Sequence, residues 1–339
     1  MNEKPQLRVG IACNLKTDSS SEAQAEFDEP ETIAAISGAL RSGGFDPVVL
    51  EASERFLQRL EAEKPDIVFN IAEGKSGRAR EAQIPAILEY SGVPYTGSDA
   101  VALAISLDKA LTKRVVRSFG IETPAFAVIE KGTMELPEDI LYPVIVKPNA
   151  EGSGIGISDG CVAANPAQLR ELAGKEMERH VRDLLIEQYI DGREFTVGIL
   201  GNKPDLHVFE PMEVIFKKLR GPYKVYSYEV KKNFRDYIVY RCPPELPDCL
   251  MTRMKRDAEV IFESIGCRDF ARIDFRLSGD GTVHFIEINP LPGLAPGYSD
   301  FPMLAEFSGI AYNDLICKML NCALKRYGSY CSRPAGEGV

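Results

Sequence analysis

The first third of the chain alternates between short apolar runs and amphipathic stretches. Apolar runs bounded by polar or turn-forming residues predict buried strands at residues 7–13, 48–51 and 66–72. After the first run, Asp28 with Glu31 three residues later marks the start of a helix whose apolar Ile33, Ile36 and Leu40 share one face, and Gly43-Gly44 marks its end. A second helix is expected at 53–63. Strands that alternate with helices predict a parallel sheet flanked by helices, that is, a Rossmann-like N-terminal domain.

The remainder of the chain has shorter and less regular periods. Helices are expected near residues 107–119 and 168–181. Short strands are expected at 125–130, 144–147 and 184–188, which together predict a small α+β unit. From residue 194 the chain is rich in strands, and it closes with helices at 248–264 and 313–327. The expected class is therefore α/β, with α+β units after the first domain.

Composition limits the possible partners. The 339 residues carry 40 Lys and Arg against 50 Asp and Glu, a formal charge of −10, which disfavours nucleic acids and anionic membrane surfaces as partners. No apolar run approaches the ~20 residues of a membrane span and the start is polar, so a cytoplasmic protein is expected. The eight cysteines form no Cys-x-x-Cys pair, which disfavours a disulfide framework or a zinc site. Small molecules are the expected partners, and a homodimer stays open.

The strongest candidate chemistry lies in two alternating strands joined by a Ser-Gly-Asp-Gly turn at 278–281. Alternation puts one set of apolar side chains on a core face: Ile273, Phe275, Ile286 and Ile288. The opposite face carries the polar set: Arg272, Asp274, Glu287 and Asn289. A turn centred on residues 279–280 would put Arg272 opposite Glu287, and Asp274 diagonal to Glu287 at ~7–8 Å.

Two carboxylates and an amide oxygen at that separation are ligands that suit Mg²⁺. A solvated polar face joined by Arg–Glu pairs is the alternative. The second strand continues into Asn289-Pro290-Leu291-Pro292-Gly293, so Gly293 could present an N–H group to a reacting oxyanion. An ordinary Pro/Gly turn also fits this segment.

Two further segments could bind a nucleotide. Lys147 ends a predicted strand and precedes a glycine-rich loop, in which backbone N–H groups can approach phosphates while the lysine supplies charge. The candidate phosphate-binding residues of this loop are Lys147, Glu151, Gly152 and Ser153. The strand ending near 188 exposes backbone groups that could pair with an adenine edge, and Glu194 could accept from ribose hydroxyls. Periodicity alone predicts only that residues 186–197 form a strand, a turn and a second strand.

Taken in order, these segments resemble the D-alanine:D-alanine ligase branch of the ATP-grasp superfamily, over residues 7–325. The most specific matches are Val93 to Ser98 with Asp108-Lys109, the Lys147 loop, Gly192 to Val197, Ala271 to Phe275, and Glu287 to Gly293. The resemblance implies an ATP-grasp fold preceded by a Rossmann-like domain. It also implies four regions: a substrate domain at 1–105, a small subdomain at 106–190, a C-terminal subdomain with the metal site at 191–330, and a flexible tail at 331–339.

The resemblance also implies roles for individual residues. The expected ligands of ATP are Lys109, Lys147, Glu151, Gly152, Ser153, Glu187, Gln188, Ile190, Glu194 and Lys231. Lys231 would reach the transferring phosphate. The oxyanion would be stabilised by Arg272 and the Gly293 N–H. Ser153 would also be catalytic, as the remaining member of a hydrogen-bonded group in which the family has a tyrosine at position 232. Two Mg²⁺ ions, with Mn²⁺ as an alternative, would bind Asp274, Glu287 and Asn289.

The chain departs from the family pattern where the first substrate would bind. The glycine-rich turn and Ser-x-Glu segment expected after the first strand are absent, and Glu73-Gly74 replaces an expected His-Gly pair. Lys232 stands where a tyrosine is expected, whereas Ser299 lies one residue later than the family spacing. Two arginines follow Glu73, at 78 and 80. We therefore expect Glu73 to take an ammonium, Ser299 to meet the acceptor's carboxylate, and an extra substrate carboxylate to bind Arg78, Arg80 and Lys232. Arg78 and Arg80 could instead be solvated surface charges.

The expected function is that of an ATP-dependent, ADP-forming carbon–nitrogen ligase. It would activate the carboxylate of an amino-acid-like donor as an acyl phosphate and join it to the amine of a second amino acid. The altered substrate region favours a peptide or specialised-metabolite pathway. D-alanine:D-alanine ligation for the cell wall is one alternative, and a non-catalytic nucleotide-binding module is the other.

Overall fold

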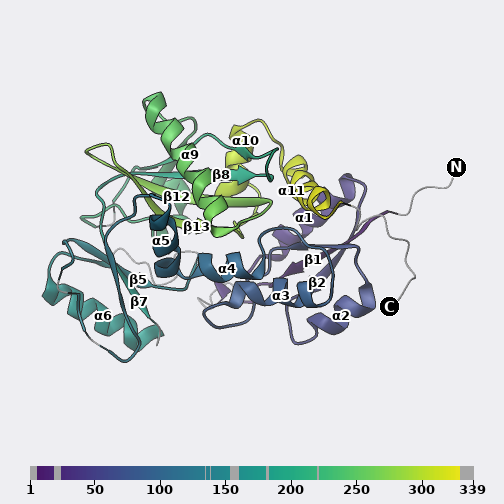
Figure 1. Cartoon of the computed structure of the whole chain (residues 1–339), viewed down its shortest axis with the longest axis horizontal. Coiled ribbons are helices and arrows are strands. Elements are labelled where there is room, and N and C mark those ends of the chain that lie inside the picture. The colour runs from purple at the N-terminus through teal and green to yellow at the C-terminus, as the bar shows by residue number, and fades with distance from the viewer. Residues whose placement is uncertain are drawn as a thin grey trace.

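The structure is a computed structural model that describes residues 6–18, 24–133, 135–137, 139–152, 160–180, 183–219 and 221–328 (Figure 1). Within these ranges, four side chains are not described: those of Arg179, His180, Tyr228 and Lys232. Ser153, predicted to bind ATP, and the predicted tail at 331–339 lie outside the described residues.

The N-terminal region is built around a three-stranded parallel sheet, as the alternating pattern predicts. Its strand order is β2-β1-β3, from β1 (Arg8–Cys13), β2 (Asp46–Glu51) and β3 (Ile67–Asn70). Its helices are α1 (Pro30–Ser42), α2 (Phe56–Glu63) and α3 (Gln83–Tyr90), the last preceded by a 3₁₀ turn at Arg80–Ala82. The loop between β3 and α3 therefore brings Glu73 and Glu81 to the carboxyl edge of the sheet, where ligands of such sheets commonly bind.

Two short helices, α4 (Ala100–Leu107) and α5 (Lys109–Ser118), replace the single helix predicted near 107–119. Asp108 lies between them, and its carboxylate accepts from Leu111 N at 2.9 Å, which caps the first turn of α5. A β/extended backbone at Asp108 separates the two helices. The predicted domain boundary at 105/106 falls inside α4; the other boundaries stay predictions.

The small α+β unit forms as predicted. Its antiparallel sheet has the order β4-β7-β5-β6, from β4 (Phe126–Ile129), β5 (Val144–Pro148), β6 (Val162–Ala163) and β7 (Leu184–Gln188). Helix α6 (Pro166–His180) packs on β5, β6 and β7 (Figure 1). Lys147 and Glu187 lie on adjacent strands of this sheet.

The C-terminal region is a six-stranded antiparallel sheet. The order is β11-β10-β8-β12-β13, with β9 paired to β8. The strands are β8 (Gly192–Leu200), β9 (His207–Val208), β10 (Met212–Phe216), β11 (Ile238–Arg241), β12 (Phe270–Ser278) and β13 (Val283–Asn289). The helices are α7 (Tyr228–Lys232), α8 (Phe234–Tyr237), α9 (Asp248–Ile265), α10 (Asp300–Phe307) and α11 (Tyr312–Tyr327).

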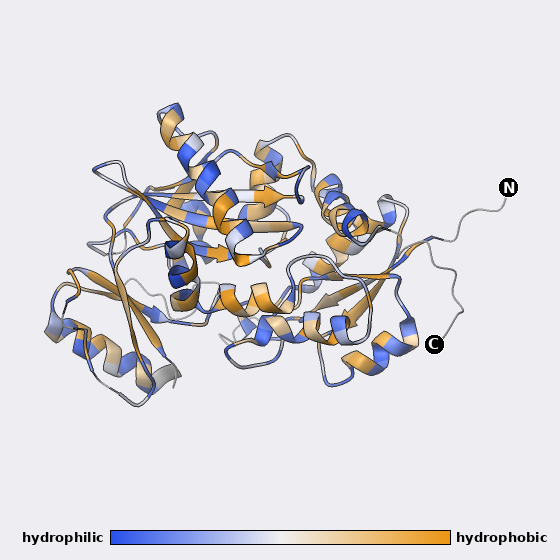
Figure 2. Cartoon of the chain, in the orientation of Figure 1, coloured by the Kyte–Doolittle hydropathy of each residue, from blue (hydrophilic) through white to orange (hydrophobic). Residues whose placement is uncertain are grey.

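The cores join regions that are far apart in sequence. Helix α1 packs against α11, and one apolar cluster includes Ile36 and Leu40 of the first helix with Leu315 and Met319 of the last. A second cluster lies between the large sheet and α5 and α9. Apolar residues gather on the strands, while the helices are two-faced (Figure 2). Within the described part of the chain, no helix is both long and apolar enough to cross a membrane.

The predicted register of the β12–β13 hairpin was wrong. Arg272 pairs with Asn289, not with Glu287, and Asp274 lies directly opposite Glu287. One cause is the turn, which uses three residues and ends on Gly281 at φ +87°. The correction brings the two carboxylates closer, since directly opposed residues have Cβ atoms ~4.5–5.5 Å apart.

A β-bulge is the other cause of the register change. The partner of Asp274 is Glu287, but the partner of the next residue, Phe275, is Phe285. Ile286 is therefore the extra residue, and it lines a cavity instead of joining the core as predicted. The other three apolar residues of the predicted core face are buried in the second cluster: Ile273, Phe275 and Ile288.

Candidate active site

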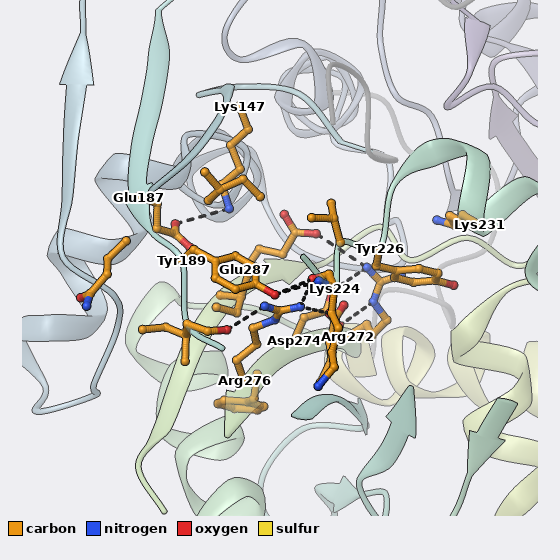
Figure 3. Close-up of a pocket in the computed structure, with 17 residues that line it drawn as sticks. Lys147, Glu187, Tyr189, Lys224, Tyr226, Lys231, Arg272, Asp274, Arg276 and Glu287 are labelled. Carbon is orange, nitrogen blue, oxygen red and sulfur yellow. Dashed lines mark hydrogen bonds and ion pairs between the residues drawn. The ribbon is translucent and has the colours of Figure 1, made fainter. Parts of the chain in front are cut away.

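Two cavities meet on the polar face of the β12–β13 hairpin. The smaller, about 120 Å³, lies between the hairpin and the strand ends around Glu187 and Glu194 (Figure 3). The larger, about 720 Å³, lies between the hairpin and the loops of the N-terminal sheet. Both are lined by Lys231, Arg272 and Glu287, so groups bound in the two cavities would meet at these three side chains.

The smaller cavity begins at a buried ion cluster on the α+β unit. Glu187 is 2% exposed, and its carboxylate lies 3.0 Å from Lys113 Nζ and 3.3 Å from Lys147 Nζ. Burial alone would raise the pKa of Glu187, but the two lysines outweigh it and lower that pKa. Burial lowers the pKa of Lys113 to about 8. Glu187 is therefore an anionic anchor that holds Lys147 at the cavity wall, which is also lined by Gln188.

Arg276 organises the next part of the cavity. Its guanidinium donates to Ile190 O at 2.7 Å and to Glu194 Oε2 at 2.9 Å, and the ring of Tyr189 lies 5.0 Å from it. It also donates to the carbonyl of Lys224, in the segment between β10 and α7. The predicted adenine and ribose residues thus line one cavity. Arg276 joins the segment around Lys224 to Ile190 and Glu194 in the wall of that cavity (Figure 3).

Arg272 lies at the junction of the two cavities. Its guanidinium donates to both oxygens of Asp274, at 3.1 and 2.8 Å, and lies 3.4 Å from Asp300 Oδ2. Asp300 in turn accepts from Tyr240 at 2.9 Å. These neighbouring carboxylates raise the pKa of Arg272 despite burial. The residue is therefore a fixed positive charge at the junction of the two cavities.

The oxygen donors beside Arg272 fit a hard cation. Asp274 and Glu287 are directly opposed, Asn289 is two residues further along the strand, and Thr196 Oγ1 donates to Asp274 at 2.7 Å. Lys109 lies 3.5 Å from Glu287. Burial raises the pKa of Asp274, whereas Lys109, Lys147 and Arg272 lower that of Glu287. Among the described residues no cluster of three or more His, Cys, Asp or Glu could hold a metal. A Mg²⁺ ion here would need phosphate oxygens to complete its ligands, which is how Mg²⁺ usually binds with nucleotides.

Two lysines approach the junction from other elements. Lys109, at the start of α5, is buried and donates to the Glu151 carbonyl in the glycine loop. Lys231 lies on α7, and burial together with the charge of Arg272 lowers its pKa. Gly152, also in the loop, lines the larger cavity, and a Cβ at that position would overlap Glu26. Lys109, Glu151 and Gly152 are thus brought together as the sequence predicts.

The loop after β13 forms one wall of the larger cavity. Gly293 and Ser299 both line it, and a Cβ on Gly293 would come within 2.8 Å of Ser299 Oγ. Ser299 Oγ accepts from Ala295 N at 3.1 Å, which fixes the loop's curve. At Gly293 the backbone therefore faces the larger cavity without a side chain to cover it.

The far end of the larger cavity is acidic. It is lined by Glu26, Glu73 and Glu81, the first from the loop before α1 and the others from the loop after β3. Arg80 donates to Glu26, lies 3.5 Å from Glu151 and donates to Ala150 O at 2.9 Å. Burial and the charges of Glu26 and Glu81 raise the pKa of Glu73, and burial raises that of Glu81 to about 7.

Not every predicted substrate residue reaches this cavity. Glu73 and Ser299 line it, but Arg78 and Arg80 do not. Arg78 is largely exposed and pairs with Asp108 at 2.8 Å, while Arg80 is buried behind the glutamates. The side chain of Lys232 and the whole of Ser153 lie outside what the structure describes.

Several site residues were missed by the sequence reasoning. Arg276 lies on the same face of β12 as Arg272 and Asp274, so strand alternation could have found it. Ile286 reaches the cavity through the bulge, and Lys113 is a long-range partner of Glu187. Glu26 and Glu81 lie in an acidic loop and a charged turn with no regular period. Asp300 immediately follows the predicted Ser299, so its position could also have been suspected.

Comparison with known proteins agrees with this geometry. The family model described as "D-ala D-ala ligase C-terminus" matches residues 115–321. The chain is 33% identical to D-alanine–D-alanine ligase B of Chromobacterium violaceum, covering 93% of this chain and 98% of that protein. It is also 33% identical to protein y4sG of Sinorhizobium fredii, covering 86% and 87%.

The fold also matches solved structures. D-alanine–D-alanine ligase from Bacillus anthracis, in complex with ATP, has a TM-score of 0.74 at 23% identity and covers 94% of this chain and 98% of that one. The expected ATP-grasp fold and ligase class are thereby confirmed. The chain belongs to the D-alanine–D-alanine ligase family of ATP-grasp enzymes, the ATP-dependent, ADP-forming carbon–nitrogen ligases.

Proposed function

We propose that this enzyme forms a dipeptide, with D-alanine as the amino acid whose amine is acylated. The donor carboxylate would attack the γ-phosphorus of ATP, releasing ADP and leaving an acyl phosphate. The acceptor's amine would then attack the acyl carbon, and phosphate would leave. The observation that carries this proposal is the meeting of the two cavities at Lys231, Arg272 and Glu287.

Each side chain at the junction has a task in this proposal. Lys109, Lys147 and Lys231 bind phosphate oxygens, while Ile190 and Glu194 bind the nucleoside. Arg272 and the Gly293 N–H stabilise the oxyanion formed when the amine attacks. Two Mg²⁺ ions, with Asp274, Glu287 and Asn289 as their protein ligands, would neutralise charge on the transferring phosphate.

D-alanine as acceptor is supported by three relatives named D-alanine–D-alanine ligases, whose matches cover 93%, 85% and 94% of this chain. They favour D-alanine–D-alanine-type ligation over a specialised-metabolite pathway, for which the comparisons provide no support. A module that only binds nucleotide has no need of an arginine fixed by two carboxylates beside Lys231.

The proposal is tested by incubating the enzyme with ATP, Mg²⁺, D-alanine and a panel of second amino acids. ADP and phosphate should appear in equal amounts with a dipeptide that has D-alanine at its C-terminus, identified by mass and by comparison with synthetic standards. AMP and pyrophosphate, or ATP consumption without any dipeptide, would overturn it.

A further inference from the structure

The acidic end of the larger cavity has more negative charge than its own cations neutralise. Glu81 is only 8% exposed and lines the cavity, yet its carboxylate has no hydrogen bond or ion pair with any described residue. The same holds for the Glu73 carboxylate within the described chain. A buried carboxylate without a partner is costly, so its retention at a cavity wall points to a cationic ligand.

The nearby cations are already engaged. Arg80 binds Glu26 and faces Glu151, and Lys16 lies 3.3 Å from Glu29. Lys109 lies beside Glu287 and the Glu151 carbonyl. The undescribed segments next to cavity-lining residues in sequence, 19–23 and 153–159, contain no lysine or arginine. No cation from those two segments can therefore complete the cluster.

A charge count indicates how many cations would fit. When all three are ionised, Glu26, Glu73 and Glu81 carry three formal negative charges and Arg80 carries one positive charge, so the cluster as a whole lacks two positive charges. The α-ammonium of an amino acid would supply one of these two. A second cation on the same molecule would supply the other, and a cavity of about 720 Å³ has room for a side chain that carries it.

We propose that the donor substrate is an amino acid with a second amine on its side chain, and that this side-chain ammonium binds Glu81 and Glu73. This inference rests on the proposed function, since it names the donor of the same ligation. Glu26, held by Arg80 beside Gly152, then receives the α-ammonium, and the donor carboxylate points toward Lys231 and Arg272. Burial raises the pKa of both Glu73 and Glu81, and a bound ammonium would offset that cost.

The same cluster argues against the extra substrate carboxylate expected from the sequence. Arg80 is neutralised by glutamates, and Arg78 is turned to Asp108, so neither offers a free positive charge to the cavity. An acidic donor would place its carboxylate beside Glu73 and Glu81. The negative charges of the donor carboxylate and of these two glutamates would then repel each other.

The test pairs each diamino acid with a neutral homologue of the same chain length, both as D and L forms. D-ornithine is compared with D-norvaline, and D-2,3-diaminopropionate with D-alanine, with D-alanine as acceptor throughout. Dipeptide formation should show kcat/KM at least tenfold higher for one diamino acid than for its neutral partner. Equal or better use of the neutral homologues, or of D-glutamate or D-aspartate, would overturn the inference.

Two variants assign the preference to the proposed residues. Glu81→Gln and Glu73→Gln should each lower, at least tenfold, the ratio of kcat/KM for the diamino acid to kcat/KM for its neutral homologue. Glu61→Gln, on the exposed face of α2, is the control and should leave both unchanged. A preference that survives in both glutamine variants would contradict the assignment. Thermal melting of each variant shows that it is folded.

Binding separates failure of this inference from failure of the proposed function. Calorimetric titration of D-ornithine and D-norvaline into the enzyme with Mg²⁺ and ADP needs no turnover. Tighter binding of D-ornithine, lost in Glu81→Gln, would support the acidic subsite even if no dipeptide forms. Equal affinities would reject it even if D-alanyl-D-alanine is made.

Discussion

The buried carboxylates at the two ends of the active site differ in whether each has a cation as its partner. At the nucleotide end each one has a cation: Glu187 has Lys113 and Lys147, and Glu194 has Arg276. At the far end of the larger cavity, Glu73 and Glu81 have none among the described residues. The first arrangement is complete without a ligand and holds lysines and strand ends in place. In the second, the carboxylates make no ion pair among the described residues, and a bound cation would stabilise their ionised form.

The difference indicates which end can change its ligand. Altering one member of the nucleotide-end network would leave a partner charge buried, so that end resists substitution. The acidic end depends on loops before α1 and after β3, where side chains can change without breaking a sheet. Under the proposed function, the nucleotide end would carry out the phosphoryl transfer, and the loop end would set the choice of donor.

The largest expected effect comes from Asp274→Asn, which removes a predicted metal ligand and the main partner of Arg272. Turnover should fall on the order of 10²–10³-fold or more, measured as ADP release from a variant that thermal melting shows to be folded. Asp205→Asn, at an exposed ion pair with Lys325, should behave as wild type. Normal activity in the Asp274 variant would contradict the placement of the β12–β13 hairpin in the catalytic site.

Lys113→Met tests whether the nucleotide end is a completed charge network. The variant leaves Glu187 with one lysine instead of two, and the free energy of unfolding should fall by about 3–5 kcal/mol in urea titrations. Lys175→Met breaks an exposed pair with Glu171, whose side chains are 62% and 64% exposed, and should cost less than ~1 kcal/mol. Equal losses in the two variants would contradict the distinction between buried and exposed pairs.

The predictability of the site follows the same division. The polar face of the hairpin could be predicted because strand alternation places Arg272 and Asp274 on one side. The register could not, because the bulge at Ile286 depends on packing against the core. Lys113 and Glu187 could not be paired either, since their contact spans two regions.

The acidic end was the least predictable from sequence. Glu73 was recognised only as a departure from the family, and Arg80 was expected to meet substrate. In the structure Arg80 serves Glu26 and Glu151 instead, because three separate loops converge around it. Loop side chains without periodicity carry little information about the contacts they make.

Stability should also respond to pH differently at the two ends. Burial raises the pKa of Glu81 from 4.5 to about 7, so the folded protein binds more protons than the unfolded chain in that range. Stability of the ligand-free enzyme should therefore fall as pH rises from about 4.5 to 7, by at most about 3 kcal/mol from this residue. Glu187 has a lowered pKa, so its contribution is present above about pH 4.5 and lost below it.

Urea titrations at several pH values measure this difference. Glu81→Gln should flatten the fall between pH 4.5 and 7, and Glu61→Gln should leave it in place. If the stability of Glu81→Gln falls between pH 4.5 and 7 as steeply as that of the wild type, burial does not raise the pKa of the Glu81 carboxyl.

The smallest expected effect concerns the segment over the nucleotide cavity. Residues 216–236 carry several lysines and arginines, and Lys224 is held down by Tyr189 and Arg276. Mg²⁺ with a non-hydrolysable ATP analogue should slow tryptic cleavage there severalfold, while D-alanine alone should not. The cleavage sites are read by mass spectrometry. Equal cleavage rates with and without the ATP analogue would contradict closure of this segment over bound nucleotide.

The packing of α1 against α11 bears on how the protein is made. Cys317 Sγ lies 3.5 Å from Ala39 O, across 278 residues of chain. The apolar face of α1 emerges from a ribosome long before the helix that covers it. The N-terminal sheet therefore stays incompletely covered until α11 has been made, and a truncated chain that stops before residue 312 keeps that face open to aggregation.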